Sequence, residues 1–253
     1  MGGHSKWANF KHKKARQDKK RGKLFSKIVK KITSAARRGG GDPETNPELR
    51  VYIDKAKDAN MPKENVERAI KKGTGDLEGV DYIDFRYEGY GPGGVAFFLT
   101  GSTDNRNRTV SEVRHTFDEH NGNLGEDGCV DWMFEDRCLF SFKDDQVDDV
   151  DEMMMFALDE GALDFEHEDV VVTIYGEMKD FAPLRDALID YGIEDFITDE
   201  VTKIAENNVE PDLSAAQQTM RLIDELEDND DIENIYHNLE LSDDVAEQIE
   251  AEA

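Results

Sequence analysis

The side chains with the clearest chemical potential lie in the first forty residues, and they suit contact with a polyanion. This stretch holds fourteen Lys and Arg residues and one acid, Asp18, which gives it a net charge of +13. The whole chain carries −27, so the other 213 residues carry −40 between them. Because the charge is segregated rather than mixed, the sequence predicts a basic arm fused to a strongly acidic body.

Residues 1–22 show no sustained apolar period, so they cannot bury enough surface to fold alone. Trp7 and Phe10 stand among the cations, and aromatic rings interleaved with positive charge are typical of nucleic-acid contact. The alternative is a solvated basic tail. We expect this segment to be mobile, or ordered by a polyanion. The candidate contact residues are His4, Lys6, Trp7, Lys11, Lys13, Lys14, Arg16, Lys19, Lys20, Arg21 and Lys23.

A second candidate contact lies at Arg106 and Arg108, since residues 76–253 contain only ten cations. Both arginines fall at the expected start of a helix, capped either by a Thr109–Glu112 capping box or by Asp104. Backbone amides at such a position attract anions, which favours a phosphate contact. Charge pairing with the acidic surroundings explains the two arginines equally well, and both interpretations stay open.

No constellation in the sequence predicts catalysis, a metal or a cofactor. Residues 89–94 match G-x-G-x-x-G by letter, but a strand is expected to follow where a dinucleotide motif needs a helix, so we expect a turn. Cys129 and Cys138 are nine residues apart without a CxxC, which predicts two reduced, partly buried thiols. The acidic run at 144–151 lacks the glycine and terminal Glu of a calcium loop. We therefore expect a non-enzymatic protein.

Apolar periodicity predicts an α+β multidomain fold. Helices are expected at 23–38, from Asn46-Pro47, after Pro62, and at 213–228. Trp132 is expected in the core, on a strand over 129–134. The predicted divisions are a basic arm plus helical bundle at 1–76, a middle α/β domain at 77–135 with 203–240, an inserted ferredoxin-like βαββαβ domain at 136–202 and an acidic tail at 241–253. Separate strands are expected at 138–142, 195–201 and 202–207.

The chain lacks an apolar run near the ~18 residues of a membrane helix and lacks a secretory signal, so we expect a cytoplasmic protein without membrane contact. The excess of acid is consistent with a high-salt host or with a partner of opposite charge.

Several motifs, taken in order, resemble the YebC family. They cover residues 1–135 densely and the remainder in general architecture. The matching stretches are GHSKWAN at 3–9, RGKLF at 21–25, GGGDP at 39–43, ANMP at 59–62, AIKKGTG at 69–75, YEGYGPGG at 87–94, TDNRNRT at 103–109 and GNLG at 122–125 with Val130, Trp132 and Phe134.

The resemblance implies a helical bundle followed by two α/β ferredoxin-like domains, one inserted in the other. It also implies DNA-binding transcriptional regulation, the role most often given to the family. The alternative role is a factor that binds the ribosome or its RNA and relieves stalling at proline-rich stretches. The sequence shows no helix-turn-helix pair with an evident recognition helix, which favours RNA on physical grounds. Nucleic acid, with or without the ribosome, is the expected partner, and no small-molecule substrate is expected.

Overall fold

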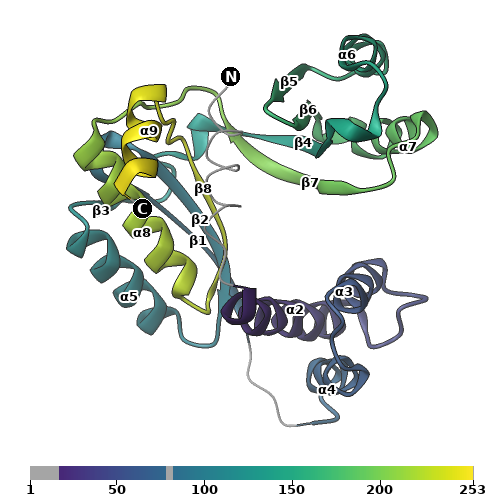
Figure 1. Ribbon diagram of the computed structural model, residues 1–253. Helices are drawn as coiled ribbons and strands as arrows, with labels where there is room; N and C mark the ends of the chain where they lie inside the picture. The colour runs from purple at the N-terminus through teal and green to yellow at the C-terminus, as the bar shows by residue number, and fades with distance from the viewer. Residues whose placement is uncertain (1–16, 78–81, 253) are drawn as a thin grey trace.

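The structure is a computed structural model that describes residues 17–77 and 82–252. It is a mixed α/β protein whose described part holds eight α-helices and two four-stranded antiparallel sheets (Figure 1). Within those residues, none of the helices combines the length and the apolar character that crossing a membrane requires.

The N-terminal part is a three-helix bundle of α2 (Gln17–Gly39), α3 (Pro47–Asp58) and α4 (Lys63–Thr74). The Asn46 side chain accepts a hydrogen bond from the Leu49 amide, which confirms the expected helix start at Asn46-Pro47. Ile32 and Leu49 are fully buried in the bundle core. Helix α2 begins at Gln17, six residues before the expected Lys23, because its first residues are polar and leave no apolar period to detect.

The first sheet, called sheet A here, has the strand order β3-β1-β2-β8. Its strands are β1 (Ile83–Tyr90), β2 (Ala96–Thr103), β3 (Asn123–Leu124) and β8 (Ile232–His237). Helices α5 (Arg106–Glu119) and α8 (Leu213–Asp228) cover one face, where Phe97, Phe117 and Leu222 are fully buried. The expected helix at 213–228 is therefore confirmed, and it packs beside strands from much earlier in the chain.

The second sheet, sheet B, has the order β5-β6-β4-β7 and is built from elements in the chain order βαββαβ. These elements are β4 (Phe134–Lys143), α6 (Val150–Asp159), β5 (Asp164–Glu168), β6 (Val171–Glu177), α7 (Phe181–Tyr191) and β7 (Phe196–Ala205). Residues of α6 and α7 pack on one face of this sheet, around Phe140, Met153 and Leu188.

Two long strands connect the sheets, which corrects the expectation of shorter, separate ones. Strands β4 and β7 pair in one register from Phe134 opposite Ala205 to Ser141 opposite Thr198, and a register shift then brings Phe142 opposite Phe196 (Figure 1). Phe134 and Ala205 also pack with Phe98 of β2. The charged residues at 135–137 interrupt the apolar pattern of β4, so the sequence pattern predicts a strand that starts only at residue 138. In the structure, residues 135–137 also form hydrogen bonds with β7 and belong to the same strand.

Trp132 is also placed differently from the expectation. Asp131–Met133 forms a 3-10 turn, and Trp132 is 68% exposed instead of buried. At 89–94 the expected turn is confirmed, because Pro92–Gly94 forms a single 3-10 turn that leads into β2 instead of an α-helix, and Gly93 and Gly94 both have positive φ. Cys129 and Cys138 are free thiols, partly and fully buried respectively, as expected.

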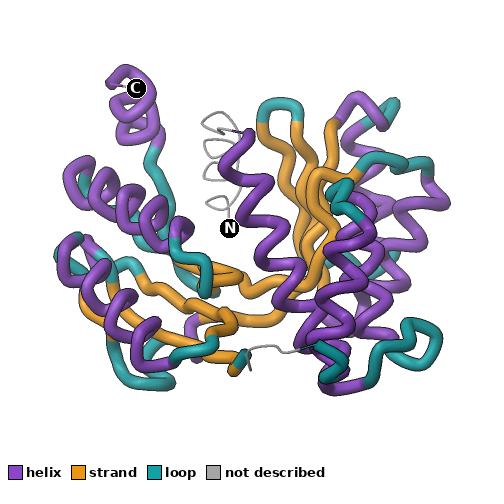
Figure 2. The backbone as a smooth tube through the Cα atoms, turned by 90° about the horizontal axis from the view of Figure 1, so that it is seen from below, coloured by secondary structure: helices purple, strands orange, loops and turns teal. Residues whose placement is uncertain are grey.

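The acidic C-terminal segment is anchored rather than loose. Helix α9 (Asp243–Glu252), which ends at the C mark in Figure 2, packs on α8. Leu241 and Ile249 are at most 7% exposed and belong to the same core as Phe97. These apolar side chains attach the acidic C-terminal segment to the core beneath sheet A.

The packing of α4 on α2 predicts the effect of one glycine substitution. A Cβ at Gly73 would lie 2.5 Å from the Thr33 carbonyl and 2.7 Å from Ala36 Cβ. We expect Gly73→Ala to lower the free energy of unfolding by about 1–3 kcal/mol, as overpacking does. Gly22→Ala is the matched control, since it lies within α2 with open space around it and should raise stability by up to about 1 kcal/mol. Urea unfolding of both variants checks this, and equal effects would contradict it.

Candidate nucleic-acid interface

The predicted contact residues divide into two groups. The backbone of α2 carries Lys19, Lys20, Arg21 and Lys23 in its first two turns, so these four cations stand on a helix rather than in a flexible tail. The other seven candidates lie outside the described residues: His4, Lys6, Trp7, Lys11, Lys13, Lys14 and Arg16.

The cations further along α2 face the body of the protein. Lys30 is 9% exposed, and its Nζ donates to Asp231 Oδ1 at 2.7 Å, to the Asp230 carbonyl at 2.9 Å and to the Ser102 carbonyl at 3.3 Å. The next residue, Lys31, forms an ion pair with Glu233. Lys30 and Lys31 therefore dock the bundle on sheet A, and part of the positive charge of the first forty residues is neutralised inside the fold.

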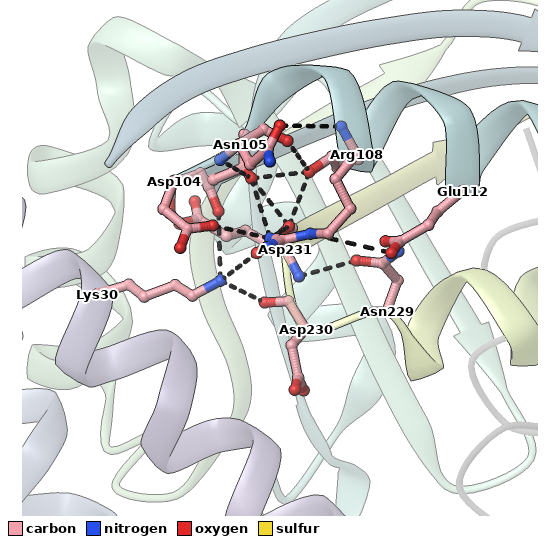
Figure 3. A network of polar contacts seen from close by, with 12 residues as sticks. Lys30, Asp104, Asn105, Arg108, Glu112, Asn229, Asp230 and Asp231 are labelled. Atoms are coloured by element: carbon pink, nitrogen blue, oxygen red, sulfur yellow. Dashed lines mark hydrogen bonds and ion pairs between the residues drawn. The ribbon is translucent and has the colours of Figure 1, made fainter. Parts of the chain in front are cut away.

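Asp231 accepts hydrogen bonds from three segments of the chain (Figure 3). Besides Lys30, Arg108 Nη2 lies 2.7 Å and Thr109 Oγ1 2.7 Å from its Oδ2. Thr103 Oγ1 donates to the same oxygen at 2.9 Å. Burial by itself would raise the pKa of this carboxyl group, but the hydrogen bonds from these partners outweigh it and hold the pKa far below its usual range.

Arg108 is one of the residues that pair with Asp231 in the folded chain. The Arg108 guanidinium pairs with Asp231 and, at 2.8 Å, with Asp104. The cap of α5 is Asn105, whose side chain accepts from the Arg108 amide, so neither the Thr109 capping box nor an Asp104 cap forms. Charge pairing is the interpretation that the contacts of Arg108 favour. Arg106 stands exposed on the first turn of α5.

A feature that sequence reasoning missed is the rigid turn that presents Trp132. Glu88 is 1% exposed, and its carboxylate accepts from the amides of Gly128, Val130 and Asp131 at 2.7–2.9 Å. The Trp132 indole Nε1 donates to the Cys129 carbonyl. The signal available in the sequence was the turn-forming pair Gly128 and Asp131 on either side of Cys129 and Val130.

Metal chemistry gains no support from the described residues. Across residues 17–77 and 82–252, no group of three or more His, Cys, Asp or Glu side chains is placed to hold an ion.

Removing the charge of Asp231 should destabilise the fold strongly. In Asp231→Asn the Lys30 ammonium stays buried without its partner, and we expect the free energy of unfolding to fall by about 3–5 kcal/mol. The matched control is Asp54→Asn, which breaks the exposed Asp54–Lys57 pair and should cost less than about 1 kcal/mol. Urea titration at neutral pH compares them, and similar losses in the two variants would contradict the role given to Asp231.

The low pKa of Asp231 also predicts a dependence on pH. A carboxyl group whose pKa is lower in the folded state contributes stability above its unfolded pKa of about 3.9 and loses it as the pH falls toward the folded value. The stability advantage of the wild type over Asp231→Asn should therefore be constant from pH 7 to about 5 and shrink below about 4. Urea unfolding at a series of pH values measures this difference, and an advantage that grows on acidification would refute the assignment.

The comparisons with known proteins cover nearly the whole chain. Residues 5–76 match the family model described as the TACO1/YebC protein N-terminal domain, and residues 82–239 match the TACO1/YebC second and third domain. A protein of Halothermothrix orenii named "Probable transcriptional regulatory protein" is 53% identical over 254 residues and is covered completely, as is this chain. One of the same name from Natranaerobius thermophilus is 50% identical over 249 residues, 98% of this chain and 99% of that protein.

A solved structure agrees with these matches. The crystal structure of a conserved hypothetical protein, Aq1575, from Aquifex aeolicus has a TM-score of 0.77 and 41% identity, covering 89% of this chain and 93% of the other. Two family models in the expected order, relatives of the same length and a similar structure confirm the resemblance drawn from the motifs. The chain belongs to the TACO1/YebC family.

Proposed function

We propose that this protein is a non-enzymatic regulator of gene expression that contacts nucleic acid through its basic N-terminal arm. The name of its relatives supports a regulatory role. The observation that carries the proposal is the inward pairing of Lys30, Lys31 and Arg108 with Asp231 and Glu233. Because these cations bind the body, the excess positive charge of the chain is concentrated at residues 1–23, ahead of the docked part of α2.

The proposal includes the domain division expected from the sequence, with the arm and bundle at 1–76, a middle domain at 77–135 and 203–240, and a ferredoxin-like insertion at 136–202. Three separate buried clusters support it, one in the bundle, one under sheet A and one under sheet B. The strand order β5-β6-β4-β7 with the chain order βαββαβ also supports the ferredoxin-like assignment. Action in the cytoplasm belongs to the same proposal.

Two kinds of nucleic acid fit this arrangement. The name of the relatives favours DNA and transcription. The charge distribution favours ribosomal RNA, because a narrow basic arm on a repelling acidic body suits entry into folded RNA better than contact along a duplex. In the described bundle, the exposed cations of α3 and α4 alternate with acids such as Asp54 and Glu67, and two of them form the Lys57–Asp54 and Lys63–Glu67 pairs. Neither helix presents the uniformly basic face of a duplex-reading helix.

Neutralising the arm tests the proposal. In the variant Lys6→Gln/Lys11→Gln/Lys13→Gln/Lys14→Gln/Arg16→Gln we expect the affinity for the physiological nucleic acid to fall at least about tenfold, because each lost phosphate contact removes counterion release. The matched control neutralises five exposed cations of the bundle, Lys55, Lys57, Lys63, Arg68 and Lys71, and should change affinity by less than about threefold.

Co-sedimentation with ribosomes and gel shifts on promoter DNA, both over a salt series, decide the target. Ribosome association that is lost only in the arm variant, with no preference for promoter over random duplex, would exclude transcriptional DNA binding. Promoter-selective binding without ribosome association would exclude the translational role. Equal losses in the arm variant and the bundle control would refute the arm as the contact.

A further inference from the structure

A buried hydroxyl group on sheet A lacks a hydrogen-bond partner. Tyr87 of β1 lies on the face that α5 and α8 cover, in the same core as Val113 and Phe117. Its side chain is 7% exposed, and its ring stacks on Phe85 with the two ring centroids 4.5 Å apart. The hydroxyl oxygen is buried and forms no hydrogen bond with the described part of the chain. Because an unpaired buried hydroxyl is costly, this one is a candidate donor to a ligand.

Two arginines of α5 lie beside this hydroxyl. Val110 packs on the core that holds Tyr87, and it has Arg106 four residues before it and Arg114 four residues after it. Residues four apart lie on one side of a helix, so both arginines flank the part of α5 that covers this core. Burial raises the pKa of Tyr87, and the guanidinium groups of Arg106 and, more weakly, Arg114 partly offset that rise. Both groups therefore stand near the hydroxyl.

The charge of these two arginines is not neutralised by a neighbouring acid. Both side chains are exposed, and within the described ranges neither forms an ion pair. Arg108, between them in the sequence, turns instead to Asp231 and Asp104 (Figure 3). The Asp231 carboxylate is already occupied by its cations and hydroxyl groups, so it is not a partner for the Tyr87 hydroxyl. Because residues 76–253 contain only ten cations, two unpaired arginines at one place stand out.

The start of α5 adds further donors at the Arg106 end. The helix is 14 residues long and has no acid in its first turn. Its first backbone hydrogen bond runs from the Thr109 amide to the Asn105 carbonyl, so the amides of Arg106 and Asn107 precede the hydrogen-bonded turn and are available to an anion. Guanidinium groups, a hydroxyl and helix N-terminal amides together match the several acceptor oxygens of a phosphate group.

We infer that Tyr87, Arg106 and Arg114 form a binding site for a small phosphate-bearing ligand at the start of α5. Arg106 is the main contact, Arg114 supplies a second guanidinium, and the Tyr87 hydroxyl donates from the core. Because Arg106 is exposed and unpaired, its guanidinium can turn outward and admit a phosphate oxygen to the hydroxyl. A small ligand fits better than a nucleic-acid strand, since Asp104 and Glu112 stand at the same end of α5 and disfavour a polyanion. This site does not depend on the proposed contact of the arm with nucleic acid.

Titration of the full chain with inorganic phosphate, at an ionic strength held constant with KCl, tests the site. A ligand that binds only the folded chain raises the unfolding temperature, and the dependence of that temperature on phosphate concentration gives an apparent Kd. In Arg106→Gln/Arg114→Gln this Kd should rise at least about tenfold, because hydrogen bonds from charged groups are lost. The matched control is Arg86→Gln, which removes an exposed arginine next to Tyr87 in the chain but on the opposite face of β1, and should leave the Kd unchanged.

The variant Tyr87→Phe separates a ligand contact from a structural one. Since its hydroxyl has no partner in the fold, its removal should leave the urea midpoint without phosphate unchanged or higher, while the Kd for phosphate rises about threefold to tenfold. Tyr90→Phe is the control, because the Tyr90 hydroxyl donates to the Cys129 carbonyl at 3.1 Å. That variant should unfold at lower urea and bind phosphate like the wild type. Equal losses of stability in the two variants, with an unchanged Kd in both, would refute the role of Tyr87.

The same phosphate affinity in the wild type and in Arg106→Gln/Arg114→Gln would overturn the site, as would an equal stabilisation by KCl alone. The source of the phosphate group is decided by a second titration, with a short single-stranded RNA. For a small ligand, the RNA affinity should be the same in the wild type and in the double variant. A loss of RNA affinity as large as the loss of phosphate affinity would overturn the assignment to a small ligand.

Discussion

The carboxylate of Asp231 is the contact on which the arrangement of this protein depends. It stands just before β8 and receives Lys30 from the bundle, Arg108 and Thr109 from α5 and Thr103 from the end of β2. Two cations and two hydroxyl groups converge on one buried acid, so its desolvation is fully compensated. Without that acid, a buried lysine and an arginine would face each other, and the bundle would lose its fixed position on sheet A.

This contact also decides which charges are available to a partner. A count over the first forty residues assigns all their positive charge to one surface. However, Lys30 and Lys31 form ion pairs with Asp231 and Glu233 within the fold, so their charge is not available to a partner. The basic arm ends where α2 begins to touch the body. The bundle that follows has mixed charge, and residues 76–253 carry a large excess of acids, which disfavours the approach of a polyanion to that part of the chain. The long pairing of β4 with β7 attaches sheet B to this frame.

Local signals predicted much of the fold. The Asn-Pro start of α3, the helix at 213–228 and the βαββαβ order of sheet B each follow from caps or periodicity over a few residues. The errors arise where a distant partner decides the structure. The alternation of apolar residues placed Trp132 in the core. The true placement depends on Glu88 of β1, whose carboxylate accepts hydrogen bonds from the amides of Val130 and Asp131 and so fixes the turn before Trp132. Nothing near Trp132 in the sequence indicates this contact. The same limit hid the bond from Lys30 to Asp231, since the two residues are 201 positions apart.

The central claim is that the arm, and not the folded body, carries the contact with nucleic acid, and the salt dependence of binding tests it most directly. For single-stranded RNA, the slope of log affinity against log salt is about −0.7 per phosphate neutralised. The account predicts a slope of about −6 for the full chain, and a slope of about −3 for a chain that lacks residues 2–16 but keeps the cations at the start of α2. A slope that is the same with and without those residues would contradict it.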